Sequence, residues 1–228
     1  MPNCNKIVLT EPCGDSARSM STARIIVEGD LASVRVLGEY SCMLESTKAM
    51  PLVVPKSHGF GPCLDSDGYF FLCDYLPIDH RRPDPVKPAH RISGLHRKSV
   101  SPTSQFGFHV TPYDGKLLLQ VEWDSSWVSF YTKLLRGNLR IDSCAYFAHH
   151  EMTLGMWRVS QHEMDGEEYR DEYYKHFKPD EPVEDCDDRN RLYATKERIM
   201  YAAHVPGSEA RAEALEDMSF LIAKFVKQ

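Results

Sequence analysis

A chain of 228 residues with 42% hydrophobic and 11% aromatic residues has the composition of a globular protein, long enough for one large domain or two small lobes. The net charge of -6, the pI near 5.9 and the absence of a basic run argue against a nucleic-acid partner. No run approaches about 18 apolar residues, so no membrane span is expected, and the N-terminus does not read as a signal peptide.

The seven cysteines are scattered, odd in number and never spaced as C-x-x-C. This usage is typical of reduced thiols rather than a disulfide framework. It therefore predicts a cytoplasmic protein.

The first part of the chain mixes strand and helix patterns. Residues 1–20 are polar without sustained periodicity and are expected to be a loose lead-in. Ser21–Val27 is rich in β-branched residues and predicts a strand, whereas Ala32–Met50 has apolar residues at helical spacing. Tyr69–Tyr75 (YFFLCDY) is a continuous apolar run that suits a buried strand. Ile78–Pro88 contains three prolines and several charges and predicts a linker or loop.

The middle of the chain predicts short elements. His90–Lys98 has one apolar helix face, and Asp114-Gly115 is a hairpin-type turn. Apolar residues at helical spacing over Trp123–Leu134 predict a helix, with Asp124 or Ser125 as its cap.

The last third is expected to be nearly all helix, over Asp165–Phe177, Asp187–Ala203 and Ser208–Lys227. Ser208 is the predicted cap of the final helix. That helix carries a wide apolar stripe of Leu215, Met218, Leu221, Ile222 and Phe225. A small α+β lobe joined to a helical lobe is the predicted architecture.

The stretch Ile141–Arg158 (IDSCAYFAHHEMTLGMWR) is the candidate site, because an acid directly follows a strand-like residue. Three interpretations compete: a magnesium carboxylate at Asp142, a zinc site of histidine and glutamate, and an ordinary buried turn. Zinc is disfavoured because the adjacent His149 and His150 should point different ways on a helix, and because H-E-x-x-H spacing around Glu151 is absent.

Several motifs in order resemble the fructosamine/ketosamine-3-kinase (protein-ribulosamine 3-kinase) family, fungal type. The resemblance runs from about residue 20 to 225. It is carried by YFFLCDY and by segments 38–61, 95–110 (LHRKSVSPTSQFGFHV), 123–135 (WDSSWVSFYTKLL), 141–158 and 187–207.

The resemblance implies an α+β, protein-kinase-like fold of two lobes. A small lobe with its hinge would span residues 21–78 after the lead-in, and a mostly helical large lobe residues 79–228. The implied activity is ATP- and Mg²⁺-dependent phosphorylation of the sugar on glycated protein lysines, a deglycation reaction. ATP and glycated lysine adducts are thus the implied partners.

The resemblance also implies roles for individual positions. Backbone groups of Cys73, Asp74 and Tyr75 would bind adenine, although this run also suits a plain core strand. Glu39 would orient the phosphate-binding lysine, although a lone helical glutamate is more often a surface charge. Asp142 would bind magnesium between the phosphates, because magnesium takes hard oxygen ligands. Trp123 and Trp127 resemble aromatics near the substrate, and core packing is the preferred interpretation of their spacing.

Three expected parts are missing from the sequence. The family's catalytic loop, His-Gly-Asp-Leu-Trp-x-Gly-Asn, does not occur, and an apparent deletion near residues 137–141 leaves the large lobe incomplete. No lysine lies between Lys6 and Lys48, and Arg24 is the only nearby cation with strand neighbours. Arg24 does not replace a lysine cleanly, and its segment also resembles the strand before the lysine strand, which would make Arg24 unrelated to the phosphate site. No glycine-rich phosphate cover is recognisable.

Two hypotheses follow. The chain is a truncated gene model or splice product of a ribulosamine/fructosamine kinase, or it is a catalytically impaired remnant that binds nucleotide or a protein partner. Loss of the catalytic base, a metal ligand and the lysine predicts that the chain as written is not an efficient kinase.

Overall fold

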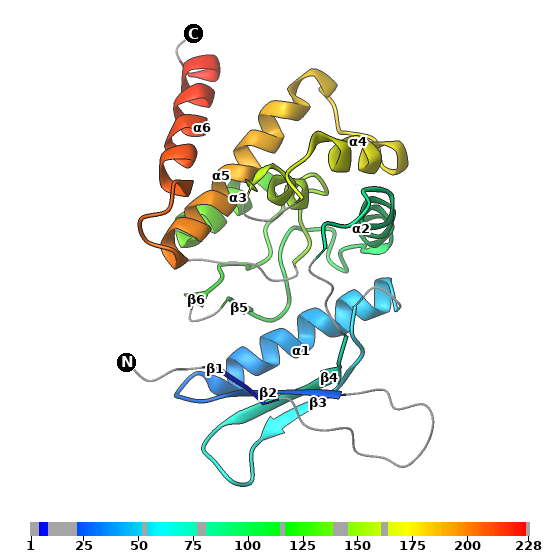
Figure 1. Cartoon of the computed structure of the whole chain (residues 1–228), viewed down its shortest axis with the longest axis vertical. Helices are drawn as coiled ribbons and strands as arrows, with labels where there is room; N and C mark the ends of the chain where they lie inside the picture. The colour runs from blue at the N-terminus through cyan, green and yellow to red at the C-terminus, as the bar shows by residue number, and fades with distance from the viewer. Residues whose placement is uncertain are drawn as a thin grey trace.

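A four-stranded antiparallel sheet forms one end of the molecule (Figure 1). The structure, a computed structural model, describes residues 5–8, 22–51, 54–76, 81–114, 117–138, 146–160 and 164–226. The sheet order is β1-β2-β4-β3. The strands are β1 Asn5–Val8, β2 Thr22–Val27, β3 Ser57–Pro62 and β4 Tyr69–Asp74.

Helix α1 (Ala32–Ala49) packs on one face of this sheet (Figure 1). Alternate residues of β4, Phe71 and Cys73, are buried there, as the two-residue period of a strand requires. Ala32 and Val36 meet them from α1 at the i, i+4 spacing that lines one helix face. The alternating residues of the strand and the helically spaced residues of α1 thus pack together in one small core.

The remaining elements form a mostly helical part above α1 (Figure 1). They are α2 Val86–Lys98, β5 Tyr113–Asp114, β6 Leu117–Leu118, α3 Trp127–Asn138, η1 Met152–Arg158, α4 Glu167–His176, η3 Val183–Asp185, α5 Cys186–His204 and α6 Ala210–Phe225. One core cluster forms around Phe130 and Leu134, and a second around Leu154 and Tyr173. The predicted α+β architecture is confirmed.

A close crossing of η1 and α5 holds the helical part together. A Cβ on Gly155 would lie 2.6 Å from the backbone carbon of Tyr193, a distance that no side chain tolerates. Glycine therefore allows the two backbones to touch. The side-chain amide of Asn190 joins them by donating to the Leu154 carbonyl at 2.8 Å.

Several predicted elements need correction. Part of the lead-in is a strand, β1, and α2 begins within the predicted linker because its first turn accommodates Pro88. Strand β3 was not predicted, since its sequence SHGFGP lacks β-branched residues. The other predicted helices, and the strands at Ser21–Val27 and Tyr69–Tyr75, are confirmed within one to four residues at their ends.

The predicted helix caps are wrong. Ser126, not Asp124 or Ser125, caps α3, because its Oγ accepts the Ser129 N–H at 3.3 Å. The Ser208 hydroxyl makes no hydrogen bond within the described residues and caps nothing.

Helix α6 does not bury its apolar stripe. Leu215 and Ile222 are each 50% exposed, whereas Ala210, Ala214 and Asp217 are buried. Helix α6 therefore packs on the protein through its small residues and through the ion pairs of Asp217 with arginines of α5. Its apolar stripe does not make this contact. Among the described residues, no helix is long and apolar enough to cross a membrane.

The cores predict a clear difference between two leucines. Leu154 is completely buried, so Leu154→Ala should lower the free energy of unfolding by about 2–5 kcal/mol through lost burial and a residual cavity. Leu64 is fully exposed, and Leu64→Ala should change it by less than about 0.5 kcal/mol. Urea unfolding of both variants measures this. Equal losses would mean that the second core cluster is not formed.

Candidate functional site

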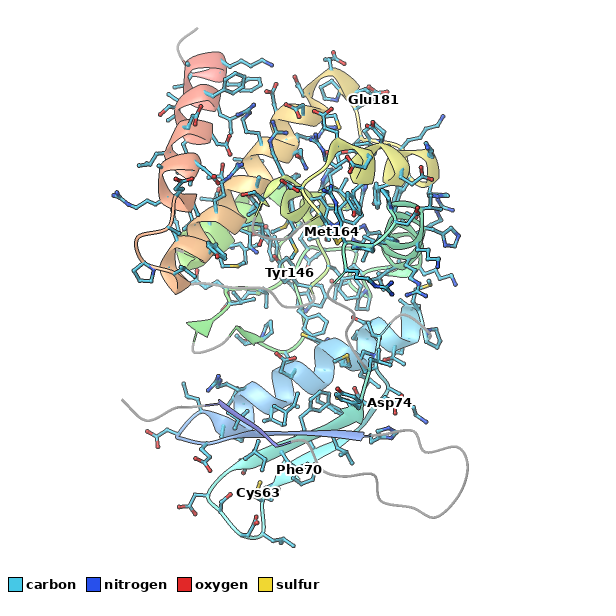
Figure 2. The ribbon with its side chains drawn as sticks, viewed as in Figure 1. Cys63, Phe70, Asp74, Tyr146, Met164 and Glu181 are labelled. Carbon is cyan, nitrogen blue, oxygen red and sulfur yellow. The ribbon has the colours of Figure 1, made fainter. Side chains whose placement is uncertain are left out.

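A pocket of about 600 Å³ lies between α1 and the helical part. Its walls come from the last turns of α1, the end of α2, the segment 99–108, the segment 146–156, and Lys196 and Glu197 of α5. Figure 2 shows Tyr146, one of the lining residues, between α1 and the helices above it. The pocket is therefore placed where a two-lobe fold would hold a ligand.

The predicted hinge residues end strand β4, where Figure 2 shows Asp74. Cys73 and Asp74 lie within the ladder between β2 and β3, and the Asp74 N–H donates to the Lys56 carbonyl at 2.9 Å. The Asp74 carboxylate also lies 2.6 Å from Nε2 of His58. The backbone of these two residues thus serves the sheet, and Tyr75, which follows the strand, is 40% exposed. None of the three residues is among those that line the pocket.

The structure brings Glu39 close to the end of β4. Neighbouring atoms remove part of the hydration of the Glu39 carboxyl and so raise its pKa, although the residue as a whole is exposed. The positive charge of Arg35 opposes this shift. The Glu39 charge in turn helps to raise the pKa of the Cys73 thiol, which is raised mainly by burial. Glu39 and Cys73 are therefore neighbours, although neither is among the residues that line the pocket.

Two other predicted site residues cannot be placed, and a third packs in the core. Asp142 lies outside the described residues, as does the side chain of Arg24, although its backbone pairs with Leu72. Trp127 packs on Phe106 and the aromatic residues of α3, as the core interpretation of its spacing requires.

Two adjacent histidines point the same way. The rings of His149 and His150 are stacked with centroids 5.1 Å apart and an angle of 28° between their planes. Their Nε2 atoms lie 2.7 and 3.5 Å from the two carboxylate oxygens of Asp180. The expectation that they point different ways is wrong, because both precede η1 rather than lying on a helix.

Glu151 belongs to a different contact. Its side chain is completely buried, and Arg189 pairs with both of its oxygens, Nε at 2.7 Å and Nη2 at 3.0 Å. The Asp180 N–H also donates to Glu151 at 2.9 Å. Glu151 is thus structural and could not complete a zinc site with the histidines. Asp180 takes its place beside them, and no local sequence pattern indicates this, because Asp180 is distant in sequence from both histidines.

A chain of polar side chains extends from the histidines into the core. The Tyr173 hydroxyl lies 3.1 Å from Nδ1 of His150 and 2.9 Å from Nδ1 of His96, whose Nε2 lies 3.2 Å from the Thr153 hydroxyl. Burial, and secondarily the charge of His150, lowers the pKa of His96 to about 4. His96 is therefore neutral at pH 7.

Lys196 and Glu197 form a buried ion pair in the pocket wall, with Nζ and Oε1 2.8 Å apart. The second oxygen of Glu197 has no hydrogen-bond partner among the described residues. An acceptor that lacks a donor in a pocket wall suits a ligand or a chain segment that offers one.

The pKa of His96 predicts a pH dependence of stability. Its folded value of about 4 lies below the ordinary 6.5, so the unfolded chain takes up the additional proton between these values. Stability should therefore fall as the pH drops from about 6.5 to 4, by roughly 3 kcal/mol at most from this residue.

The variant His96→Gln tests this contribution, because an amide can still bond to Tyr173 and Thr153. Urea unfolding at a series of pH values should show a shallower slope between pH 6.5 and 4 than in the parent. His109→Gln, which alters an exposed histidine, should keep the parental slope. An unchanged slope in His96→Gln would contradict the assignment.

Comparisons with known proteins agree with this fold. The sequence model of the family described as Fructosamine kinase matches residues 36–139, whereas no curated protein matches significantly. A "putative fructosamine-3-kinase" from Haemophilus somnus 129PT has a similar structure, with a TM-score of 0.70 and 13% identity over 89% of this chain and 84% of its own. Another from Thermobifida fusca YX-ER1 has a TM-score of 0.68 and 15% identity over 96% of this chain and 95% of its own. The family match and the shared kinase-like fold together confirm the resemblance of this chain to the fructosamine kinase family.

Proposed function

We propose that this chain comes from an ATP-dependent kinase that phosphorylates the sugar of ribulosamine or fructosamine adducts on protein lysines, and that the polypeptide as written is catalytically impaired. The family match supports the kinase class. The cytoplasmic location inferred from the cysteines is part of the same proposal.

The observation that carries the impairment is the composition of the pocket. Its carboxylates are Glu45 and Glu197, and no aspartate or asparagine lines it within the described residues. In phosphoryl transfer an aspartate accepts the proton of the attacking hydroxyl, and carboxylate or amide oxygens hold magnesium. Both glutamates are already engaged with lysines, Glu45 with Lys48 at 2.6 Å and Glu197 with Lys196.

A complete site for magnesium and ATP does not fit the described residues. Tyr75 and Glu39 are not among the residues that line the pocket, and the residues of β2 that pack toward α1 are Ile25 and Val27, which carry no charge for a phosphate. The proposed magnesium ligand, Asp142, lies outside the described part of the chain.

The short link after α3 supports the same conclusion. Helix α3 ends at Asn138, and Tyr146 already packs on Phe130 of that helix. Residues 139–145 join these points and cannot contain a further helix and a catalytic loop of the length that the family uses. We infer that the full-length reaction requires a segment that this sequence does not contain.

A non-catalytic binding module is the second candidate, and the pocket of about 600 Å³ favours it. A volume of this size suits a small organic ligand. The two candidates differ in whether ligand binding leads to phosphate transfer.

The decisive assay follows ADP release and phosphate transfer from ATP to a ribulose- or fructose-modified lysine peptide. An intact enzyme of the family is the positive control. We expect turnover lower by a factor on the order of 10⁴ or more, because the catalytic base and a metal ligand are missing. Turnover comparable to the control would overturn the proposal of impairment.

Sequencing the transcript across codons 137–141 separates the two origins. An in-frame segment that encodes the His-Gly-Asp-Leu-Trp loop would identify a truncated gene model. A continuous transcript, together with calorimetric nucleotide binding and no turnover, would identify a binding module.

A further inference from the structure

The strongest unassigned cluster joins three ligand-type side chains from two distant segments. His149 and His150 come from the turn before η1, and Asp180 comes from the connection between α4 and α5, where Figure 2 shows the adjacent Glu181. One ligand atom of each lies within 4.8 Å of the other two. We propose that these three residues bind a divalent transition-metal ion of the zinc type.

The three side chains are close enough to reach a bound geometry by a small movement of Asp180. Zinc bonds of about 2.0–2.1 Å to imidazole nitrogen and carboxylate oxygen separate neighbouring ligand atoms by roughly 3.3–3.5 Å in a tetrahedral site. Nε2 of His150 lies 3.5 Å from one carboxylate oxygen of Asp180, and Nε2 of His149 lies 2.7 Å from the other oxygen, so the carboxylate must turn to place one oxygen at about 3.4 Å from both nitrogens. The Asp180 side chain is 54% exposed and can make that small movement.

The surrounding groups orient both imidazoles for binding through Nε2. A metal on Nε2 requires a hydrogen on Nδ1, and the hydroxyl oxygens of Tyr193 and Tyr173 lie 3.2 and 3.1 Å from the Nδ1 atoms of His149 and His150. Each tyrosine can therefore accept that hydrogen, the outer-shell arrangement typical of metal-bound histidines. Tyr173 can still donate its own hydrogen to Nδ1 of His96.

One buried atom points to a cation. Nε2 of His150 is buried and makes no hydrogen bond of good geometry within the described residues, although an Asp180 oxygen lies 3.5 Å away. When Nδ1 of His150 donates to Tyr173, Nε2 carries a lone pair that faces the Asp180 carboxylate, an unfavourable approach of two acceptors. A metal ion between them satisfies both groups.

The third ligand is held by the structure behind it. The Asp180 N–H donates to the buried Glu151, and Arg189 donates to the Asp180 carbonyl at 2.6 Å. The backbone of Asp180 is thus fixed while its carboxylate stays accessible. Three protein ligands leave a fourth zinc position for water or an anion, and both histidines line the 600 Å³ pocket from which either could arrive.

Metal titration of the purified, chelator-treated full chain tests the proposal. Zn²⁺ binding is followed by calorimetry, and Co²⁺ binding by its visible absorption. We expect one ion per chain and cobalt bands of nitrogen and oxygen ligands, without the charge-transfer band that thiolates give. The latter criterion distinguishes this site from binding by the seven cysteines.

Asp180→Asn is the principal variant because its exposed side chain can change without loss of fold, and it should weaken binding at least about tenfold. Tyr193→Phe should weaken binding about 10- to 100-fold by removing the acceptor behind His149. His58→Ala is the matched control, because it removes a His–Asp pair of similar length, 2.6 Å, that has no second histidine beside it in the described chain. It should leave the affinity unchanged.

Circular dichroism confirms that each variant is folded. Absence of binding to the parent chain, a thiolate band with cobalt, or equal affinity of the parent and Asp180→Asn would each overturn the proposal. In that case the three side chains form an ion-paired cluster and nothing more.

Discussion

The buried contact between Glu151 and Arg189 is the constraint on which the candidate site depends. A carboxylate with no exposed surface must be paired and hydrogen-bonded, and removing one partner of such a pair typically costs about 3–5 kcal/mol. Arg189 also donates to the carbonyl of Asp180 at 2.6 Å and to that of Pro182 at 2.7 Å. One side chain of α5 thereby fixes the start of η1 and the connection between α4 and α5. The positions of His149 and His150 follow from this arrangement rather than from any preference of their own.

In the pocket, by contrast, a buried carboxylate is only partly paired, because one of its oxygens has no hydrogen-bond partner among the described residues. An unsatisfied buried acceptor costs about 1–3 kcal/mol, and one oxygen of Glu197 is such an acceptor in the pocket wall. A segment or ligand that donates to it would recover this energy. The unsatisfied Glu197 oxygen therefore marks the pocket wall as a place where a donor is lacking among the described residues.

Patterns with a clear period could be predicted from the sequence, and positions set by tertiary contacts could not. Helix α1 and strand β4 follow directly from apolar spacing, because each buries one regular face. Strand β3 has no such pattern, and pairing with β4 alone makes it a strand. The apolar stripe of α6 is real but exposed, because ion pairs of Asp217 with Arg191 and Arg198 set the orientation of the helix. Of the candidate site, His149 and His150 are visible in the sequence as adjacent histidines, whereas the place of Asp180 beside them is not, because Asp180 is distant in sequence and carries no local signal.

The histidines show how a local assumption can hide a site. On an α-helix adjacent side chains diverge by about 100°, so two adjacent histidines on a helix could not bind one ion. In a turn that precedes a 3-10 helix, the stacked rings converge on one carboxylate instead. Phosphate transfer and metal binding then make separate demands on this chain. Phosphate transfer depends on groups that the described pocket lacks. Metal binding depends only on residues that the Glu151–Arg189 contact already holds in place. Loss of kinase activity would therefore leave the metal site intact.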